Sequence, residues 1–368
     1  MRKILFTLPN FETAGSGRAM LNIVERLNRD QFEPTICVQR LGGSLCQEVE
    51  RQGIRLIVAP FTVDVLPYHT LPLRSWKAAR FFRPYGFDLW SSFHYLDDYT
   101  EPIIARMAGA KAWLYTKKNM SWNNRAWYLR TAFATGVAAQ NQYMLTEFFR
   151  QPRFRRKARL IQTSVDVEQF CPDTPARLRL RERLGISPSA IVAVCVAHLT
   201  PVKNHEMLVR AAALAPEVHF WLAGNATDQQ YVSRLRELCQ KLGVEDRVVF
   251  LENVQDVPAL LAEADIFVMQ SKNEACPVSL LEAMAAGLPS VVSDIPGLSA
   301  LTEPGRTGFV APLGDHAVMA AAIRRLAGEL DLRQQMGEAA RKKAVEEFQV
   351  DREVRQYVEL YELALGAG

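Results

Sequence analysis

The sequence lacks the long apolar segments that mark membrane-spanning and secreted proteins. None of its apolar runs approaches the roughly 18 residues that a membrane-spanning helix needs. The opening MRKILFTLPN begins with basic residues but holds only about five apolar ones before Pro9, too few for the apolar region of a signal peptide. We therefore expect a cytoplasmic protein whose first residues form a buried strand.

The sequence also lacks paired cysteines. Its six cysteines are scattered along the chain, with no C-x2-C pair and no histidine cluster beside them: Cys37, Cys46, Cys171, Cys195, Cys239 and Cys276. This spacing predicts neither a structural zinc site nor a disulfide framework. It agrees with a reducing compartment.

Acidic residues are few in the first part of the chain. Residues 1–165 hold 24 Lys and Arg against 12 Asp and Glu, a net charge of +12, which leaves 20 against 28, or −8, for the remainder. The densest basic stretch, RQPRFRRKAR at residues 150–159, is either a solvated loop or a surface for an anionic partner. Such a partner would be a lipid headgroup, a diphosphate lipid or a phosphorylated glycan. No nucleic acid is expected, because no nucleic-acid-binding motif accompanies the stretch.

Short apolar runs alternate with segments long enough for helices. At 368 residues the chain is long for one core and suits two domains. The first series begins with KILFTLP, a helix and FEPTICVQ, and the second includes AIVAVCVA, VHFWLAG and DIFVMQ. This alternation predicts α/β domains, each with a parallel sheet covered on both faces. We place the domains at residues 1–165 and 166–350.

The segment NEACPVSLLEAMAAG, residues 273–287, places two carboxylates near the start of an expected helix. Pro277 suits the first helical position, so the backbone N–H groups that follow it are expected to be unpaired and to attract a diphosphate. Glu274 could then accept hydrogen bonds from a sugar and Glu282 from a ribose. The alternative is an ordinary amphipathic helix with solvated acids. The expected N–H donors belong to Val278, Ser279 and Leu280.

This segment resembles the E-x7-E signature of the retaining glycosyltransferases of the GT4 family. Three further segments resemble the family and occur in its order: VCVAHLTPVKNHEMLVRAAALA (194–215), AEADIFVMQS (262–271) and LPSVVSDIPGLSALTEPGRTGFVAPLGD (288–315). The resemblance implies the GT-B fold, in which two Rossmann-like domains have parallel sheets facing across an interdomain cleft. We therefore expect a glycosyltransferase.

The resemblance also assigns the two domains. It implies an acceptor-binding first domain, a nucleotide-sugar-binding second domain, and a last helix, at about residues 351–368, that crosses back onto the first. The linker departs from the family, because Thr163 and Ser164 stand where Asn and Gly are usual.

A glycine-rich stretch, GSGRAM at residues 15–20, follows the first expected strand and opens a helix. As a dinucleotide-binding motif it lacks the third glycine, and no acid ends the second strand. By resemblance, Gly15, Ser16 and Gly17 lie against the donor diphosphate and the acceptor. A plain tight turn is the alternative.

Two basic side chains are expected beside the diphosphate. Lys203 follows a buried strand, where it can neutralise the charge that develops as the sugar leaves. The family usually pairs this lysine with an arginine, at the position of His198 here. A neutral imidazole offers one donor where guanidinium offers two, so leaving-group stabilisation is expected to be weaker or pH dependent. The alternative for His198 is a packed loop histidine.

Further candidates lie in the first domain. By resemblance, His94 lies near the transferred sugar, although a structural role is an equal alternative. Asp97 and Asp98 could orient an acceptor hydroxyl. Lys117, Lys118 and Asn119, which follow the strand AWLYT, are expected to line the same cleft. Trp122 and Trp127 are expected to be exposed.

Together these observations predict a metal-independent, retaining glycosyltransferase without a cofactor. The catalytic candidates are Glu274, Lys203, His198 and His94, and the nucleotide base is expected near Asn253 and Val254. UDP-sugars are the favoured donors and GDP-mannose the second choice. The acceptor would be a hydroxyl of a glycan or a lipid-linked glycan, in bacterial surface-polysaccharide or glycoconjugate synthesis at the inner face of the membrane. A sugar-nucleotide epimerase and a non-catalytic binding protein are the alternatives.

Overall fold

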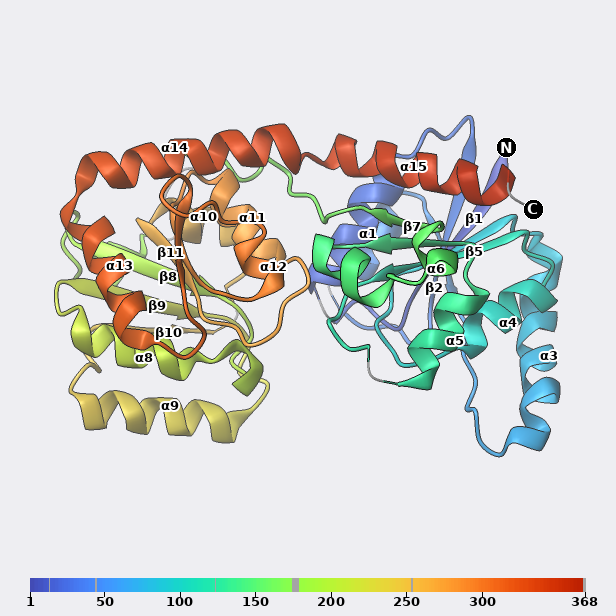
Figure 1. Cartoon of the computed structure of the whole chain (residues 1–368), viewed down its shortest axis with the longest axis horizontal. Coiled ribbons are helices and arrows are strands. Elements are labelled where there is room, and N and C mark those ends of the chain that lie inside the picture. Colours follow the sequence, from blue (N-terminus) through green and yellow to red (C-terminus); the bar gives the residue numbers. More distant parts are fainter. Residues whose placement is uncertain (13, 44, 123, 174–178, 253, 367–368) are drawn as a thin grey trace. The chain divides into compact units, whose positions relative to one another are not determined.

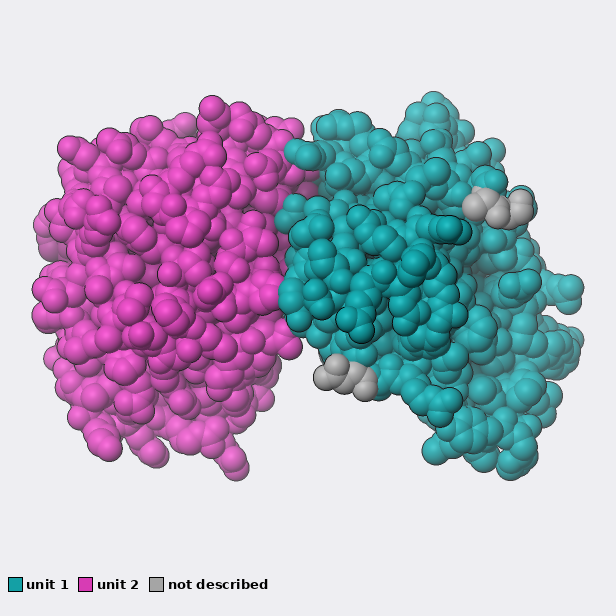
Figure 2. Space-filling view, viewed as in Figure 1, with its two compact units in different colours: residues 1–163, 350–368 teal, residues 164–349 magenta. Residues whose placement is uncertain are grey.

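The chain forms two compact units in a computed structural model that describes all residues except 13, 44, 123, 174–178, 253 and 367–368 (Figure 1). Unit 1 comprises Met1–Thr163 and Val350–Gly368, and unit 2 comprises Ser164–Gln349 (Figure 2). The predicted boundary lay between residues 165 and 166, and the predicted last helix began at about residue 351. No helix among the described residues is long and apolar enough to cross a membrane.

Unit 1 is built on a seven-stranded parallel sheet. Its strands are β1 (Arg2–Leu8), β2 (Phe32–Val38), β3 (Arg55–Val58), β4 (Leu89–Ser92), β5 (Ala112–Lys117), β6 (Gly136–Ala139) and β7 (Ala158–Leu160). Their order is β3-β2-β1-β4-β5-β6-β7, so the direction of winding reverses between β1 and β4. Its α-helices are α1 (Ala14–Arg26), α2 (Leu45–Arg51), α3 (Leu71–Phe82), α4 (Thr100–Met107), α5 (Arg125–Phe133), α6 (Pro152–Arg155) and α15 (Val350–Gly366).

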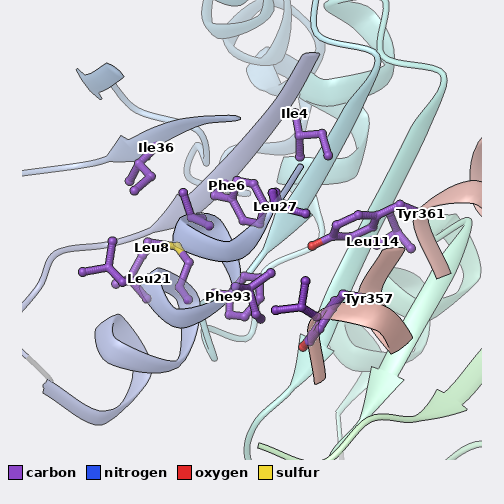
Figure 3. Close-up of a cluster of buried hydrophobic side chains, with 14 of the residues drawn as sticks. Ile4, Phe6, Leu8, Leu21, Leu27, Ile36, Phe93, Leu114, Tyr357 and Tyr361 are labelled. Atoms are coloured by element: carbon purple, nitrogen blue, oxygen red, sulfur yellow. The ribbon is translucent and has the colours of Figure 1, made fainter. Parts of the chain in front are cut away.

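Helix α15 completes the core of unit 1, although nearly two hundred residues separate it from β7. Its aromatic side chains Tyr357 and Tyr361 lie among the side chains of β1 and of the segment after β4, including Phe6 (Figure 3). Their hydroxyls also reach strand side chains, at 3.0 Å from Tyr361 to Ser91 and 2.7 Å from Tyr357 to Thr116. The last helix is therefore an integral part of the first domain.

Unit 2 repeats this architecture with six parallel strands. They are β8 (Ile191–Val196), β9 (Val218–Ala223), β10 (Val248–Leu251), β11 (Ile266–Met269), β12 (Ser290–Ser293) and β13 (Gly308–Ala311), in the order β10-β9-β8-β11-β12-β13. The winding reverses between β8 and β11. Its α-helices are α7 (Leu180–Arg183), α8 (His205–Leu214), α9 (Gln229–Leu242), α10 (Val257–Ala262), α11 (Val278–Ala285), α12 (Pro296–Ser299), α13 (His316–Gly328) and α14 (Leu330–Glu347). The prediction of two Rossmann-like parallel-sheet domains is confirmed.

The basic stretch at residues 150–159 is not a solvated loop. It forms α6 and enters β7, and part of its charge serves the fold. The Lys157 ammonium donates to the carbonyls of Ala132, at 3.0 Å, and Ala134, at 2.6 Å. The Arg159 guanidinium donates to the carbonyls of Arg156 and Ala158. Most of its charge still faces solvent, because five of its six basic residues are exposed: Arg150, Arg153, Arg155, Arg156 and Arg159.

The docking of α15 can be tested with two leucines of the same helix. Leu360 is 4% exposed and belongs to the core, whereas Leu363 is 53% exposed. Leu360→Ala should lower the free energy of unfolding of unit 1 by about 2–5 kcal/mol, because it removes buried methyl groups and leaves a cavity. Leu363→Ala should change it by less than about 0.5 kcal/mol. Urea unfolding followed by circular dichroism measures both, and equal effects would contradict the packing described here.

Candidate active site

The strongest candidate site lies at the carboxyl edge of the sheet of unit 2. Lys203 follows β8 and Glu274 follows β11, the two strands between which the winding reverses. Because the carboxyl ends of parallel strands meet at one edge, side chains that lie 71 positions apart come together. The Lys203 Nζ donates to Glu274 Oε1 at 2.5 Å, and the carboxylate side chain is only 10% exposed. The two predicted residues therefore form an ion pair.

Backbone contacts hold the two loops of this ion pair together. The carbonyl of Val202 accepts hydrogen bonds from the Lys272 N–H at 2.8 Å and from the Ser271 hydroxyl at 3.2 Å. The Ser271 carbonyl in turn accepts the hydroxyl of Ser293, at the end of β12, at 2.8 Å. The loops after three neighbouring strands are thus one connected structure beneath the ion pair.

Gly297 brings a further segment against this structure. It lies in α12, and a Cβ atom placed on it would be 2.1 Å from the Glu274 carbonyl oxygen and 2.9 Å from that of Ala275. Only glycine permits this approach without a backbone shift. The sequence analysis missed this residue, and the signal for it was a glycine that directly follows Asp-Ile-Pro at the end of a buried strand.

The start of α11 differs from its prediction in two details. Pro277 precedes the helix in an extended conformation, and the helix begins at Val278. The Leu280 N–H donates to the Pro277 carbonyl at 3.2 Å, so it is not an outward-pointing donor as expected. The N–H groups of Val278 and Ser279 have no acceptor within the helix, because first-turn N–H groups precede every helical carbonyl. The helix start can therefore offer these two donors to an anion.

Glu282 lies one turn further along α11, in a half-buried position. No hydrogen bond or ion pair joins its carboxyl group to another described residue. Burial raises the pKa of this carboxyl to about 7. Glu282 is therefore only partly ionised at neutral pH until a ligand supplies hydrogen-bond donors.

The remaining predicted residues of unit 2 are less informative. His198 lies in the loop after β8, and partial desolvation, followed by the charge of Lys203, lowers the pKa of its imidazole. It is therefore neutral at pH 7, as the sequence analysis assumed. Val254 is half-buried against the core, and Asn253 lies outside the described residues.

His94 lies in a fully buried polar network of unit 1. Its Nδ1 accepts the Leu96 N–H at 3.2 Å, so the ring proton belongs to Nε2, which donates to Glu101 Oε2 at 2.7 Å. Burial, followed by the nearby Arg130 charge, lowers the pKa of His94, so the ring is neutral. Both ring nitrogens are occupied, which leaves only the backbone of His94 for the predicted contact with a sugar.

Glu101 and Arg130 are the centre of this network, and the sequence analysis missed both. Glu101 accepts the hydroxyls of Thr7 and of Ser92, the latter at 2.7 Å, and the Arg130 guanidinium at 3.4 Å. The guanidinium carbon lies 5.0–5.6 Å from the ring centroids of three aromatic residues: Trp113, Tyr115 and Trp127. Buried charges must be paired to be tolerated, and here they join the ends of β1 and β4 to α4 and α5.

The prediction that Trp127 is exposed is wrong. It is fully buried, because its ring covers both Arg130 and the Lys117 ammonium, whose Nζ lies 3.3 Å from the ring centroid. Trp122 is partly buried and stacks on Phe148, with ring centroids 5.2 Å apart. Trp127 therefore is not exposed as predicted, and Phe148 covers one face of the Trp122 ring.

Lys117 and Lys118 serve internal contacts at the end of β5. The Lys117 Nζ donates to Asn119 Oδ1 and, at 2.6 Å, to the Ser121 carbonyl. Burial lowers the pKa of Lys117 to about 6. The Lys118 ammonium lies 3.4 Å from the Ser16 carbonyl, and burial lowers its pKa to about 8. These residues hold the loop after β5 and the start of α1 in place.

The glycine-rich stretch lies inside α1, which begins at Ala14, and does not form a turn ahead of the helix. Gly15 is exposed, whereas Gly17 is buried. A Cβ atom on Gly17 would lie 2.8 Å from the Phe11 ring and 2.9 Å from the Leu45 side chain. Close packing therefore explains Gly17, while Ser16, through its carbonyl, contacts Lys118.

Unit 1 has a hollow of about 620 Å³ beside the reversal of its sheet. The segments after β2, β3 and β4 line it, with Gln39, Thr62, Val63, Asp64, Val65, Arg74, Asp97 and Asp98. Asp98 is committed to the fold, because its oxygens accept the Thr100 and Glu101 N–H groups at 3.0 Å. Asp97 Oδ2 accepts Asn124 Nδ2 at 2.5 Å, which leaves Oδ1 for a ligand. The hollow is polar and can accept hydroxyl groups.

Known proteins resemble both the sequence and the fold. Residues 176–343 match the family described as Glycosyl transferases group 1. The chain is 31% identical over 184 residues to N-acetyl-alpha-D-glucosaminyl L-malate synthase of Bacillus anthracis, which covers 50% of this chain and 48% of that protein. It is 31% identical over 198 residues to the GDP-mannose-dependent alpha-(1-6)-phosphatidylinositol monomannoside mannosyltransferase of Mycolicibacterium smegmatis, covering 50% and 51%. The match thus spans about half the length of these curated relatives.

A solved structure extends the likeness in fold to the whole chain. The crystal structure of Anabaena HepE in complex with UDP-glucose matches with a TM-score of 0.84 and 23% identity, over 98% of this chain and 100% of that one. At this identity the likeness establishes the fold alone, and it confirms the predicted GT-B class. Residues 176–343 are thus similar in sequence to the glycosyl transferases group 1 family, and the chain as a whole shares the GT-B fold.

Proposed function

We propose that this protein transfers a sugar from a nucleotide-diphosphate sugar to a hydroxyl of a glycan or lipid-linked acceptor, with retention of configuration and without a metal ion. The observation that supports it most is the Lys203–Glu274 ion pair beside the start of α11. A cation, a carboxylate and backbone donors at one sheet edge match the charge distribution of a sugar attached to a diphosphate. The family of residues 176–343 supports the same reaction class.

The donor would bind by replacing the internal ion pair. Its diphosphate would take the Lys203 ammonium and the N–H groups of Val278 and Ser279, and its sugar hydroxyls would donate to the Glu274 carboxylate. The ribose hydroxyls would donate to Glu282, for which no other described residue is a partner. Each group of the donor then meets a side chain or backbone group of complementary polarity.

Charge neutralisation is the main contribution of these groups to the reaction. As the bond from the sugar to the diphosphate breaks, negative charge grows on the leaving oxygen, and Lys203 and the helix start stabilise it. His198, neutral at pH 7, can add one N–H donor. Glu274 would bind the hydroxyls of the sugar and hold the ring beside Lys203. It would not act as a nucleophile. The acceptor would attack the face from which the diphosphate leaves, with a diphosphate oxygen taking the proton.

UDP-sugars are the favoured donors and GDP-mannose the second choice. The structure of Anabaena HepE with UDP-glucose supports the first, and the mannosyltransferase of Mycolicibacterium smegmatis, which uses GDP-mannose, supports the second. The polar hollow of unit 1, with Asp64, Asp97 and Gln39, suits the hydroxyls of an acceptor sugar. An acceptor of this kind belongs to polysaccharide or glycoconjugate synthesis on the cytoplasmic side of a membrane.

The reaction class can be tested with a panel of UDP, GDP, ADP and dTDP sugars in the presence of EDTA. The wild-type protein should be thermally stabilised by one nucleotide class and should transfer or slowly hydrolyse its sugar. Glu274→Gln should lower turnover by about 100-fold or more, since the lost contacts act on the reacting sugar. Glu206→Gln, on the first turn of α8, is a matched control and should keep wild-type turnover.

Other outcomes would contradict the proposal. Conversion of the donor sugar without an acceptor would favour an epimerase. Binding without transfer or hydrolysis would favour a non-catalytic binding protein. Loss of turnover with EDTA would contradict transfer without a metal ion.

The raised pKa of Glu282 predicts a pH dependence of donor binding. Ribose hydroxyls donate to the ionised carboxylate, so the affinity for a nucleotide sugar should rise up to about tenfold between pH 6 and pH 8, around the pKa of about 7, and then level off. Protonation of His198 acts in the opposite sense, because its positive charge at low pH would favour the diphosphate. Calorimetric titration with UDP-glucose suits this test, because its diphosphate does not titrate in this range.

Glu282→Gln serves as the control for this dependence. It should bind UDP-glucose more weakly at pH 8, by about tenfold or more, because a hydrogen bond to a charged group is lost. Its affinity should no longer rise between pH 6 and pH 8. A variant that keeps the full rise would show that another group causes it.

A further inference from the structure

Helix α3 of unit 1 has two contrasting faces. The inward face is buried and consists of Ser75, Ala78, Ala79 and Phe82, and the helix packs on α4 (Figure 1). The outward face repeats at the same helical spacing with Leu73, Trp76, Lys77 and Arg80, all exposed. An outward helix face that combines large apolar and basic side chains differs from the mixed charges of an ordinary solvated helix.

The surrounding segment shares this character. Residues 65–87 contain four basic residues, Arg74, Lys77, Arg80 and Arg83, and no Asp or Glu. Five large apolar or aromatic side chains are between 45% and 66% exposed: Leu66, Tyr68, Leu73, Trp76 and Phe81. The Arg74 guanidinium donates to the carbonyls of Leu66 at 2.7 Å and Pro67 at 3.0 Å, which holds the loop before α3 against the helix. The loop and helix therefore present one surface.

A hollow of about 500 Å³ lies on this surface, between α3 and the end of α4. Trp76, Ala79, Arg80, Arg83, Pro84 and Met107 line it. The Arg80 guanidinium carbon lies 5.7 Å from the Trp76 ring centroid. Apolar side chains and two guanidinium groups at one hollow suit a phosphate that is attached to a hydrocarbon chain.

We propose that this face of α3, with its preceding loop, binds the surface of a membrane that contains anionic lipids. Aromatic side chains insert favourably between headgroups and acyl chains, and basic side chains are attracted to anionic headgroups. The absence of acidic residues from the segment removes the repulsion that such a surface would otherwise exert. This inference goes beyond the transfer reaction, because membrane binding is measured without a sugar donor.

The location differs from the one that the sequence suggested. The stretch at residues 150–159 has the denser charge, but Lys157 and Arg159 donate to backbone carbonyls. Arg153 lies 5.0 Å from the Tyr128 ring centroid. Arg155 and Arg156 remain exposed, and they provide a charge-matched control for α3.

Flotation of the full chain with vesicles of phosphatidylcholine, with and without phosphatidylglycerol, tests the proposal. The wild-type protein should bind only the anionic vesicles, and less at high salt. Arg80→Gln/Arg83→Gln should weaken binding about 30-fold, because each basic residue near an anionic surface contributes roughly fivefold. Trp76→Ala/Phe81→Ala should also weaken binding, whereas Arg155→Gln/Arg156→Gln should bind like wild type.

Three results would overturn the proposal. The first is that the wild-type protein binds neither kind of vesicle. That result would favour a protein partner for the outward face of α3. The second is that Arg80→Gln/Arg83→Gln binds like wild type. The third is that Arg155→Gln/Arg156→Gln loses as much binding as the α3 variant. All four substitutions in α3 and its C-terminal turn replace exposed side chains, and equal melting temperatures would show that the variants are folded.

Discussion

The ion pair between Lys203 and Glu274 is the interaction on which the candidate site depends. It joins the loops after β8 and β11, which share backbone contacts through Val202, and Gly297 closes the structure behind Glu274. The pair also satisfies two charges that would be costly if left alone in a partly buried position. A ligand that offers a negative group to the lysine can displace the carboxylate, and hydroxyl donors on the same ligand can then bind Glu274. A sugar attached to a diphosphate, the proposed donor, offers both kinds of group.

A second buried charge network gives unit 1 a different role. Glu101 and Arg130 are fully buried. They contact each other and His94, and the Arg130 guanidinium also contacts aromatic rings. Such a network stiffens the carboxyl edge of the sheet of unit 1. Two hollows of unit 1 can hold a ligand, the polar one after β2, β3 and β4 and the basic, apolar one on α3. The first is the proposed site of the acceptor sugar, and the second is the proposed membrane-binding surface.

The parallel sheets could be predicted from the sequence, because the alternation of apolar runs with helical segments is a local pattern. The same pattern placed the candidate site residues after the ends of strands. Lys203 and Glu274 meet for that reason. Contacts across distant segments were not predictable in the same way. The sequence analysis assigned no role to Glu101 and Arg130 and expected Trp127 to be exposed, because only the tertiary fold brings Arg130 against both of the others. The hydrogen bond from Leu280 to Pro277 depends on backbone angles, which the sequence leaves open.

The most direct test of the central claim is the affinity for UDP, without a sugar, of wild type, Lys203→Met and Glu274→Gln. If the diphosphate replaces Glu274 as the partner of Lys203, Lys203→Met should bind UDP about tenfold more weakly or worse, because a charge-assisted hydrogen bond is lost. Glu274→Gln should bind UDP at least as tightly as wild type, because the lysine is released from its carboxylate. Equal losses of UDP affinity in both variants would contradict the account.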